Sequence, residues 1–355
     1  MSAPVYNPLS DLEFRLLNDW QRDFPLVSRP YAELAARLGS DETRVLRCLA
    51  GLKARGYVSR IGAVFRPHVL GSSTLAALAC PADRLEEVAR VIDALPEVNH
   101  NYEREHAYNL WFVVTAPTRE QVAQVLAEVH RRTGLAPLDL PMLADYHIDL
   151  GFNLQPGTTT EGAEVAQALR SPHQDAAGSL AHAAALRAQM QSDDYALAAA
   201  LEDGLPLTPR PYTRLAARCG ASEAEVLARI ERLLALSVIR RFGVVVRHRE
   251  LGYTANAMVV WDIPSPQVDR AGRLLAAQPA VTLCYQRPRR LPEWPYNLFS
   301  MVHGRDRAAV LAQVSRLQEM LRNALGLPDV SGQPLFSRRR FKQCGARYST
   351  LARAA

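Results

Sequence analysis

The pattern of apolar and polar positions predicts short amphipathic helices followed by an alternating strand. Apolar residues recur at helical spacing over 9–19 and 31–38, and Ser40 or Asp41 can cap a further helix that runs to about Arg55. Gly39 and Gly56 end the last two of these helices, and residues 57–65 then alternate like a strand. Short helices joined by a glycine turn and followed by a strand are typical of a winged helix-turn-helix.

The pattern changes after this strand to a mixture of strands and helices. Strands are predicted over 74–80, 98–102 and 109–115, helices over 83–95 and 118–133, and a last extended segment follows. The order βαββαβ is that of the ferredoxin-like fold. We therefore expect an α+β protein.

The whole unit occurs twice. RPYAELAARLG, from Arg29, matches RPYTRLAARCG, from Arg210, and GAVFRPHVLG, from Gly62, matches GVVVRHRELG, from Gly243, so both pairs lie 181 residues apart. PEVNHNYER matches PAVTLCYQR further on, and YNLWFVVT matches YNLFSMVH 188 residues later. The second copy has gained residues mainly in the loop RPRRLPEWP. Internal repeats of this length indicate a tandem duplication.

The duplication predicts five segments. They are a helix-turn-helix domain over 1–66, a ferredoxin-like domain over 67–154, a linker over 155–191, a second helix-turn-helix domain over 192–247 and a second ferredoxin-like domain over 248–355. The linker is rich in Ala, Gly, Ser, Thr and Gln and has few large apolar residues.

Composition narrows the class of protein. The 355 residues are 48% hydrophobic, without an apolar run long enough to span a membrane or a secretory start, so we expect a cytoplasmic protein with no membrane partner. The five cysteines form no CxxC pair, which argues against zinc, an iron–sulfur cluster or a disulfide framework. The net charge of +6 comes mostly from arginine and suits either nucleic acid or a polyanionic small molecule.

Four segments carry a family resemblance: NYEREHAYNLWFVV and DYHIDLGFNL in the first copy, and YNLFSMVHG and LFSRRRFKQCGARY in the second. With the domain order, they resemble the Lrp/AsnC group and, within it, the fused D-plus-L sirohaem decarboxylases of haem d1 biosynthesis. The resemblance covers nearly the whole chain outside the linker. It implies that the two ferredoxin-like domains pair as an intrachain pseudo-dimer.

The same resemblance implies a reaction. It is the non-oxidative removal of two acetate carboxyl groups, at C12 and C18, from sirohaem to give 12,18-didecarboxysirohaem. The implied partner is this iron tetrapyrrole, with no cofactor beyond the iron of the substrate sirohaem. A homodimer, or an interaction with other haem d1 biosynthesis enzymes, is also implied.

Arginines fit a substrate with many carboxylates, because a guanidinium binds a carboxylate through two hydrogen bonds. The predicted substrate-binding cations lie before the YNLW strand, in the inserted loop and in the final segment: Arg104, Arg287, Arg289, Arg290, Arg338, Arg339, Arg340, Lys342 and Arg347. The aligned end of the first copy, DYHIDLGFNL, contains no arginine. We therefore expect the main pocket in the second copy.

Histidines fit the proton that decarboxylation needs, because loss of CO2 leaves carbanion-like density on a methylene carbon. His106 precedes the YNLW strand and His303 ends the YNLF strand, and both match the decarboxylase pattern. Each is predicted as a catalytic proton donor or as a ligand to the substrate iron, and His147 is a third choice. Tyr108 and Tyr296 could hydrogen-bond a propionate or pack as strand aromatics, and Asn297 could bind substrate or close a turn.

Two other functions remain open. A helix-turn-helix in a basic protein is typical of a transcriptional regulator, but the second helix of copy two sets Arg229 and Arg232 against three glutamates, which a phosphate backbone would repel. We therefore expect no nucleic-acid partner. A non-catalytic haem sensor would use the same arginines and histidines as the enzyme.

Overall fold

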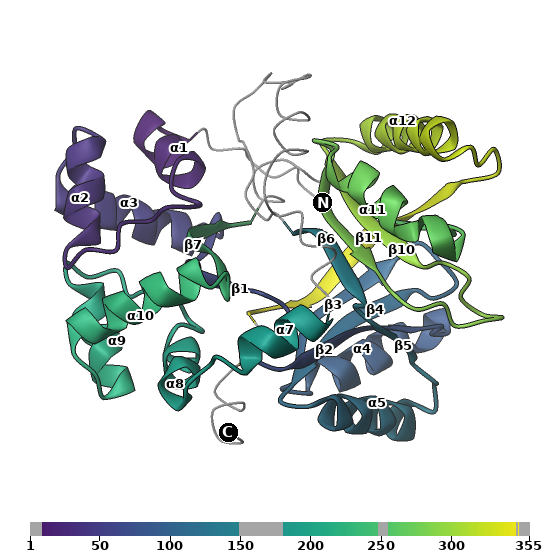
Figure 1. The fold of residues 1–355 in the computed structure, drawn as a ribbon, viewed down its shortest axis with the longest axis horizontal. Coiled ribbons are helices and arrows are strands. Elements are labelled where there is room, and N and C mark those ends of the chain that lie inside the picture. The colour runs from purple at the N-terminus through teal and green to yellow at the C-terminus, as the bar shows by residue number, and fades with distance from the viewer. Residues whose placement is uncertain (1–8, 149–179, 248–254, 346, 348–355) are drawn as a thin grey trace. The chain divides into compact units, whose positions relative to one another are not determined.

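The computed structural model describes residues 9–148, 180–247, 255–345 and 347, and the chain divides into two compact units (Figure 1). Unit 1 contains residues 1–66 and most of 196–251, and unit 2 contains 67–150 and 252–355 with the segment before Ala196. Most of the predicted linker, the end of DYHIDLGFNL and the start of the second ferredoxin-like domain lie outside the described residues. The bounds of the five predicted segments remain predictions.

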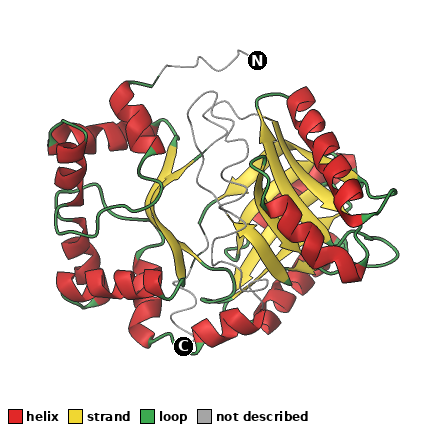
Figure 2. Ribbon diagram, turned by 45° about the horizontal axis from the view of Figure 1, so that its top comes forward, coloured by secondary structure: helices red, strands yellow, loops and turns green. Residues whose placement is uncertain are grey.

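Unit 1 holds the two helix-turn-helix copies. The first comprises α1 (Asp11–Asn18), α2 (Pro30–Arg37), α3 (Glu42–Ala54) and β1 (Val58–Phe65), and the second comprises α8 (Ser192–Ala200), α9 (Pro211–Cys219), α10 (Glu223–Ala235) and β7 (Ile239–Val246). The predicted cap of α3 is present, since the Asp41 side chain accepts from the amide of Arg44 at 2.8 Å. The strands β1 and β7 pair antiparallel with Gly62 opposite Gly243, and Figure 2 shows them beside the helices of this unit.

Unit 2 holds the two ferredoxin-like copies. The first comprises β2 (Ser72–Leu78), η1 (Ala82–Arg84), α4 (Leu85–Asp93), β3 (Val98–Arg104), β4 (Leu110–Ala116), α5 (Arg119–Thr133), β5 (Leu138–Pro141) and β6 (Ala144–Ile148). The second comprises β8 (Ala255–Trp261), η3 (Ser265–Gln267), α11 (Val268–Ala276), β9 (Val281–Gln286), β10 (Leu298–Gly304), α12 (Arg307–Leu325) and β11 (Gly332–Gln343), and α7 (Leu180–Arg187) also lies in this unit.

The strands of unit 2 pair in the order β5-β2-β4-β3-β11-β8-β10-β9-β6. In each copy the first four strands of unit 2 lie in the order fourth, first, third, second, which is the ferredoxin-like arrangement. The predicted α+β fold, with two repeats and an intrachain pseudo-dimer, is confirmed.

The two copies exchange strands, which the sequence did not predict. Residues 332–336 of β11 pair with β8 of their own copy, but from Ser337 onward β11 pairs with β3 of the first copy. In the same way β5 pairs with β2, whereas β6 pairs with β9 of the second copy. Neither half of the nine-stranded sheet is therefore built from one copy alone.

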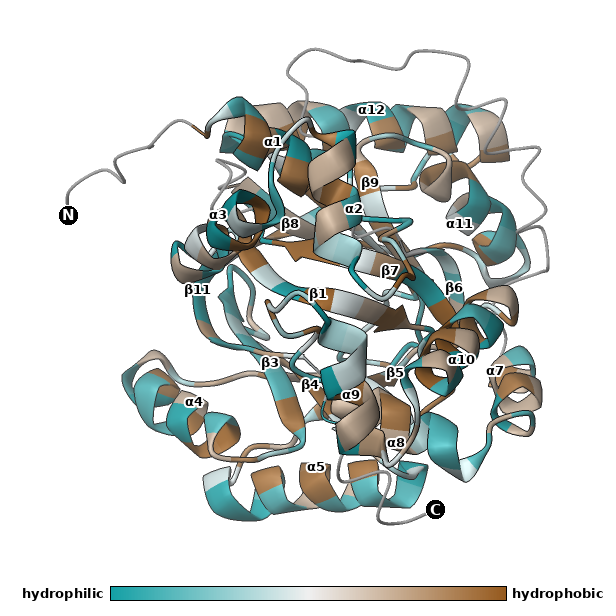
Figure 3. Cartoon of the chain, turned by 90° about the vertical axis from the view of Figure 1, so that its left-hand side faces the viewer, coloured by the Kyte–Doolittle hydropathy of each residue, from teal (hydrophilic) through white to brown (hydrophobic). Residues whose placement is uncertain are grey.

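Alternation along the strands separates two kinds of core. Leu110 and Phe112 pack with α4 and α5 residues, whereas Trp111 between them packs with Met258 and Phe299 of the other copy. The helix α5 buries Val122, and Figure 3 shows hydrophobic residues alternating with hydrophilic ones along it. Each sheet thus has a helix-covered face and an inner face that packs on the other copy.

No helix among the described residues is long and apolar enough to cross a membrane.

Candidate active site

The loop between β3 and β4 carries His106 into a cluster of aromatic rings. Its ring meets Trp294 of the inserted loop edge-on, with centroids 5.4 Å apart, and stacks on Tyr108. Trp294 is fully buried and also contacts Trp111, Tyr296 and Phe299. The insertion of the second copy therefore reaches the inner core, where it meets the predicted histidine of the first.

A hydrogen bond fixes which nitrogen of His106 carries the proton. The amide of Tyr108 donates to Nδ1 of His106 at 3.0 Å, so the neutral imidazole carries its proton on Nε2. Burial lowers the pKa of His106 below its ordinary value, which favours this neutral form. In this tautomer Nε2 donates a hydrogen bond, and its lone pair is not available to an iron.

His303 lies on β10, on the same face as Phe299 and Met301. It is half-buried and stands directly opposite Asn256 of β8. The side-chain oxygen of Asn256 is buried and accepts no hydrogen bond.

The two predicted catalytic histidines belong to different parts of the continuous sheet. His106 follows β3, and β11 and β8 lie between β3 and β10, the strand of His303. Neighbouring strands lie about 4.8 Å apart, so three strand spacings separate the two histidines across the sheet. A large planar ligand could extend from one toward the other.

Arg104 and Arg287 occupy equivalent places in the two copies and make equivalent bonds. Nη1 of Arg104 donates to the Leu335 carbonyl at 3.0 Å, and Nη1 of Arg287 donates to the Leu140 carbonyl at 2.5 Å. Burial lowers the pKa of each guanidinium to about 10, so both remain charged at neutral pH. Each arginine thus links its copy to a strand of the other copy, β11 for Arg104 and β5 for Arg287.

The other arginines of the inserted loop also have partners within the protein. Arg289 donates to the carbonyls of Pro295 at 2.7 Å and Ile263 at 2.6 Å, and it pairs with Asp262 at 2.5 Å. Arg290 donates from Nε to the Asp139 carbonyl on β5 at 2.8 Å. These bonds hold the insertion in place.

The tail cations lie on the sheet of the first copy because β11 crosses over to β3. Arg338 pairs with Glu103 and Glu105, and Arg339 pairs with Glu103 at 3.2 Å and also with Glu86. Lys342 donates to the carbonyls of Asp93 and Leu95 at the end of α4, while the side chains of Arg340 and Arg347 are exposed. The predicted cluster is therefore divided: Arg287 and Arg290 lie near β5, whereas the tail lies beside β3 of the first copy and not among the second copy's own strands as expected.

The polar strand residues of the YNL segments mostly support structure. The amide group of Asn297 accepts from the Ile263 amide at 3.0 Å and donates to the Ile263 carbonyl at 2.8 Å, as Asn109 does with Cys80. The Tyr296 hydroxyl hydrogen-bonds Gln333, and Tyr108 lies edge-on to Trp294. His147 stands opposite Cys284 of β9.

The structure places a further histidine, His100 on β3, beside the predicted residues, and the sequence analysis missed it. His100 and Tyr102 stack with ring centroids 6.1 Å apart on β3, and Gln343 and Arg340 of β11 stand opposite them. Alternation places His100, Tyr102 and Arg104 on the inner side of the sheet. The pattern His-x-Tyr-x-Arg was visible in the sequence as polar residues at every second position of a strand.

The equivalent surface of the second copy has a different composition. Leu283 and Tyr285 of β9 stand at the places of His100 and Tyr102, and Asp145 of β6 lies opposite Tyr285, where Arg340 lies opposite Tyr102. Asp145 is only 7% exposed. We call the surface of His100, Tyr102, Arg104 and Arg340 the β3–β11 face, and that of Leu283, Tyr285, Arg287 and Asp145 the β9–β6 face.

Comparisons with known proteins identify both halves of the chain. Residues 70–147 and 250–342 match the AsnC-like ligand binding domain, and residues 13–58 and 194–240 match the siroheme decarboxylase NirDL-like HTH domain. The siroheme decarboxylase NirDL subunit of Paracoccus pantotrophus is 45% identical over 349 residues, which cover 97% of this chain and 99% of the relative. The chain belongs to the siroheme decarboxylase family.

Other family members agree with this placement. The siroheme decarboxylase NirL subunit of Stutzerimonas stutzeri is 55% identical over 149 residues, 42% of this chain and 85% of that subunit. A crystal structure of the siroheme decarboxylase NirDL in co-complex with an iron-uroporphyrin III analogue is 27% identical, with a TM-score of 0.63 over 97% of this chain and 96% of that one. Siroheme decarboxylases are carboxy-lyases, so this fused member is an enzyme of that class.

Proposed function

We propose that this siroheme decarboxylase removes the acetate carboxyl groups at C12 and C18 of sirohaem to give 12,18-didecarboxysirohaem. Its family supports an iron tetrapyrrole as substrate, and a related crystal structure holds an iron-uroporphyrin III analogue. The observation that carries the proposal is the difference between the equivalent faces, because only the β3–β11 face combines a histidine with an exposed arginine.

Each decarboxylation breaks the bond between the acetate methylene and its carboxylate. The electron pair stays on the methylene carbon, where the conjugated macrocycle delocalises it, and CO2 leaves. A proton then binds this carbon and converts the methylene to a methyl group. The protein must therefore hold the carboxylate in place and deliver one proton for each CO2 released.

The two predicted histidines suit different tasks. His303 is the proposed proton donor, because burial lowers the pKa of His106 and so disfavours a protonated ring there. His106 donates a hydrogen bond from Nε2 to a substrate carboxylate, since its Nδ1 already accepts from Tyr108.

The predicted substrate-binding cations also fall into two groups, one that binds the substrate and one that supports the structure. Arg340 and Arg347 extend exposed side chains from the tail and bind peripheral carboxylates of the substrate, with Arg338 and Arg339 beside them. Arg104, Arg287, Arg289, Arg290 and Lys342 bond main-chain carbonyls and hold the strands and the insertion that form the site.

Anaerobic incubation of the purified chain with sirohaem, followed by mass spectrometry of the tetrapyrrole, tests the proposal. Loss of two CO2 supports the enzyme. A spectral shift of the tetrapyrrole with unchanged mass would instead support a non-catalytic haem sensor. Absence of binding, with sequence-specific binding of duplex DNA, would support the regulator.

A further inference from the structure

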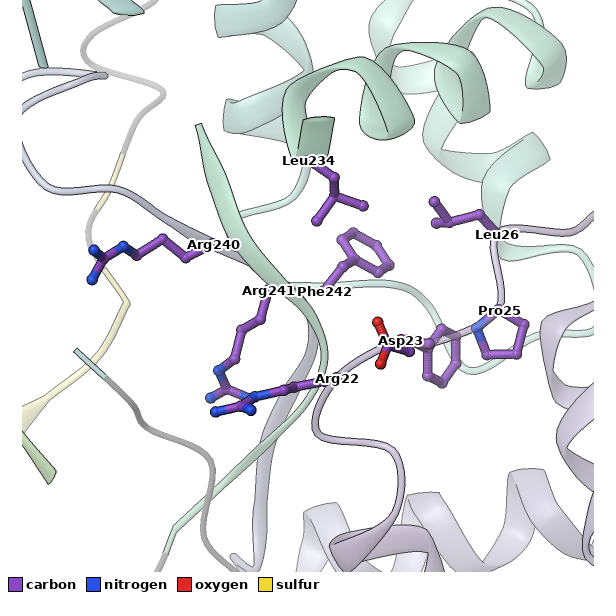
Figure 4. Close-up of a pocket in the computed structure, with 9 residues that line it drawn as sticks. Arg22, Asp23, Pro25, Leu26, Leu234, Arg240, Arg241 and Phe242 are labelled. Carbon is purple, nitrogen blue, oxygen red and sulfur yellow. The ribbon is translucent and has the colours of Figure 1, made fainter. Parts of the chain in front are cut away.

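A pocket of about 290 Å³ opens in unit 1, between the segment that follows α1 and the start of β7 (Figure 4). Phe24, Leu26, Leu234 and Phe242 form an apolar wall. Figure 4 shows Leu26, Leu234 and Phe242 on one side of the pocket and the side chains of Arg22 and Arg241 on the other. The pocket thus has an apolar part and a cationic part.

The duplication provides an internal comparison for this pocket. At an offset of 181 residues, Phe24 corresponds to Leu205, Leu26 to Leu207 and Phe242 to Ile61, and these counterparts line the equivalent place in unit 1. There the volume is only about 10 Å³. One copy of the same architecture is open and the other is closed.

One backbone position explains the closure. Gly204 has φ +79°, and a Cβ built on it would lie 2.5 Å from the Ile61 carbonyl oxygen and 2.8 Å from Cβ of Arg60. This close approach lets the Leu205 amide donate to the Ile61 carbonyl at 2.6 Å.

The open copy has a side chain at the equivalent position. Asp23 replaces Gly204 at φ +51°, and its Cβ prevents the same approach. The equivalent hydrogen bond, from the Phe24 amide to the Phe242 carbonyl, is 3.2 Å long instead of 2.6 Å. The strand and the segment are therefore held apart at Asp23, and the space between them is the pocket.

Charge and apolar character differ between the copies as well. Arg22 stands where the closed copy has Asp203, and Arg240 stands where it has Ser59. Leu234 replaces Lys53, which extends the apolar wall. The open pocket is therefore richer both in arginine and in apolar surface than its counterpart.

We propose that this pocket binds a small organic anion, specifically a carboxylate with an aromatic or aliphatic body. The body would pack against Phe24 and Phe242, and the carboxylate would meet the guanidinium of Arg22 beside that of Arg241. A volume near 300 Å³ with apolar walls and a few polar groups is typical of small-ligand sites. Three arginines in the lining, Arg22, Arg240 and Arg241, outnumber its one carboxylate, Asp23. The site lies in the helix-turn-helix unit and is independent of the proposed decarboxylation.

Isothermal titration calorimetry of the full chain with phenylacetate, acetate and inorganic phosphate tests this site. We expect phenylacetate to bind with one site per chain, and acetate and phosphate to bind at least tenfold more weakly because they lack the apolar body. Arg22→Gln should weaken phenylacetate binding about tenfold, whereas Arg29→Gln, an exposed arginine outside the pocket, should not. No binding of phenylacetate, or equal binding of phosphate, would overturn the proposal.

Asp23→Gly is the sharper variant. Glycine adopts φ +51° without strain and allows the close approach seen at Gly204, so we expect the pocket to close and binding to be lost. The melting temperature should rise or stay unchanged, which separates closure from misfolding. Phenylacetate binding by a folded Asp23→Gly variant with wild-type affinity would contradict the inference.

Discussion

The β3–β11 face and the β9–β6 face arise from the same fold but differ in chemistry. Both have a tyrosine beside a buried arginine that bonds a main-chain carbonyl of the other copy. They differ at the neighbouring positions, where His100 and Arg340 on one face correspond to Leu283 and Asp145 on the other. The shared residues hold the two copies together, and the differing residues make one face suitable for an anionic substrate.

The largest expected effect concerns His303, which has Thr115 at the equivalent position of the first copy. His303→Ala should lower turnover of sirohaem by about 10²–10⁴-fold, since it removes the proposed proton donor. Thr115→Ala, at the equivalent position of the first copy, should leave turnover near that of wild type. Both are measured by anaerobic single-turnover assays with mass detection.

His106→Ala completes this test. It removes a hydrogen-bond donor, so we expect it to lower turnover less than His303→Ala does. Near-normal turnover in both histidine variants would refute both assignments.

The second effect concerns His68, whose environment is cationic. Burial, followed by the charges of Arg287, Arg187 and Arg119, lowers the pKa of His68 to about 4. The folded protein therefore favours neutral His68. The free energy of unfolding keeps its full value above about pH 6.5 and decreases as the pH falls toward 4, because unfolding lets His68 take up a proton. The loss at pH 4 amounts to at most about 3 kcal/mol.

His68→Gln should therefore flatten the fall in free energy of unfolding between pH 6.5 and 4, as measured by urea denaturation. His130→Gln, an exposed histidine on α5, serves as the control. If the two variants have the same pH dependence as wild type, His68 does not carry this effect.

The third effect tests what the two faces share. Arg104→Lys and Arg287→Lys should each lower the free energy of unfolding by about 1–3 kcal/mol, because each loses a buried bond to a main-chain carbonyl. Arg131→Lys, in an exposed pair with Glu128, should change it little. A lower free energy of unfolding in only one of the two variants would contradict the equivalence of Arg104 and Arg287.

The smallest effect concerns the exposed arginine of the β3–β11 face. Arg340→Ala should raise KM for sirohaem about tenfold, or about 1.4 kcal/mol, and leave kcat close to its original value. Asp145→Asn, at the equivalent position of the β9–β6 face, should leave KM unchanged. A larger effect at Asp145 would place the substrate on the other face.

The sequence was sufficient for the elements and the repeat, because helical spacing, glycine stops and alternation are local signals. It could not show that β11 leaves β8 for β3 at Ser337, since alternation determines which face a side chain takes and not which strand lies beside it. For this reason the sequence alone places the tail arginines with the inserted loop and does not bring His100 beside Arg340. The partners of Arg289 and Asn297 likewise depend on contacts distant in sequence.

The crossing strands make the two halves of unit 2 interdependent. A chain cut between its copies would give two polypeptides. In each, the last strand would lack the strand of the other copy with which it pairs, and the second strand of the ferredoxin-like unit, β3 or β9, would lose one neighbour. Unpaired strand edges of this kind favour aggregation, so each fragment would need its counterpart to remain folded. Fusion keeps the two fragments at equal dose and high effective concentration, which makes the assembly of this enzyme independent of its cellular abundance.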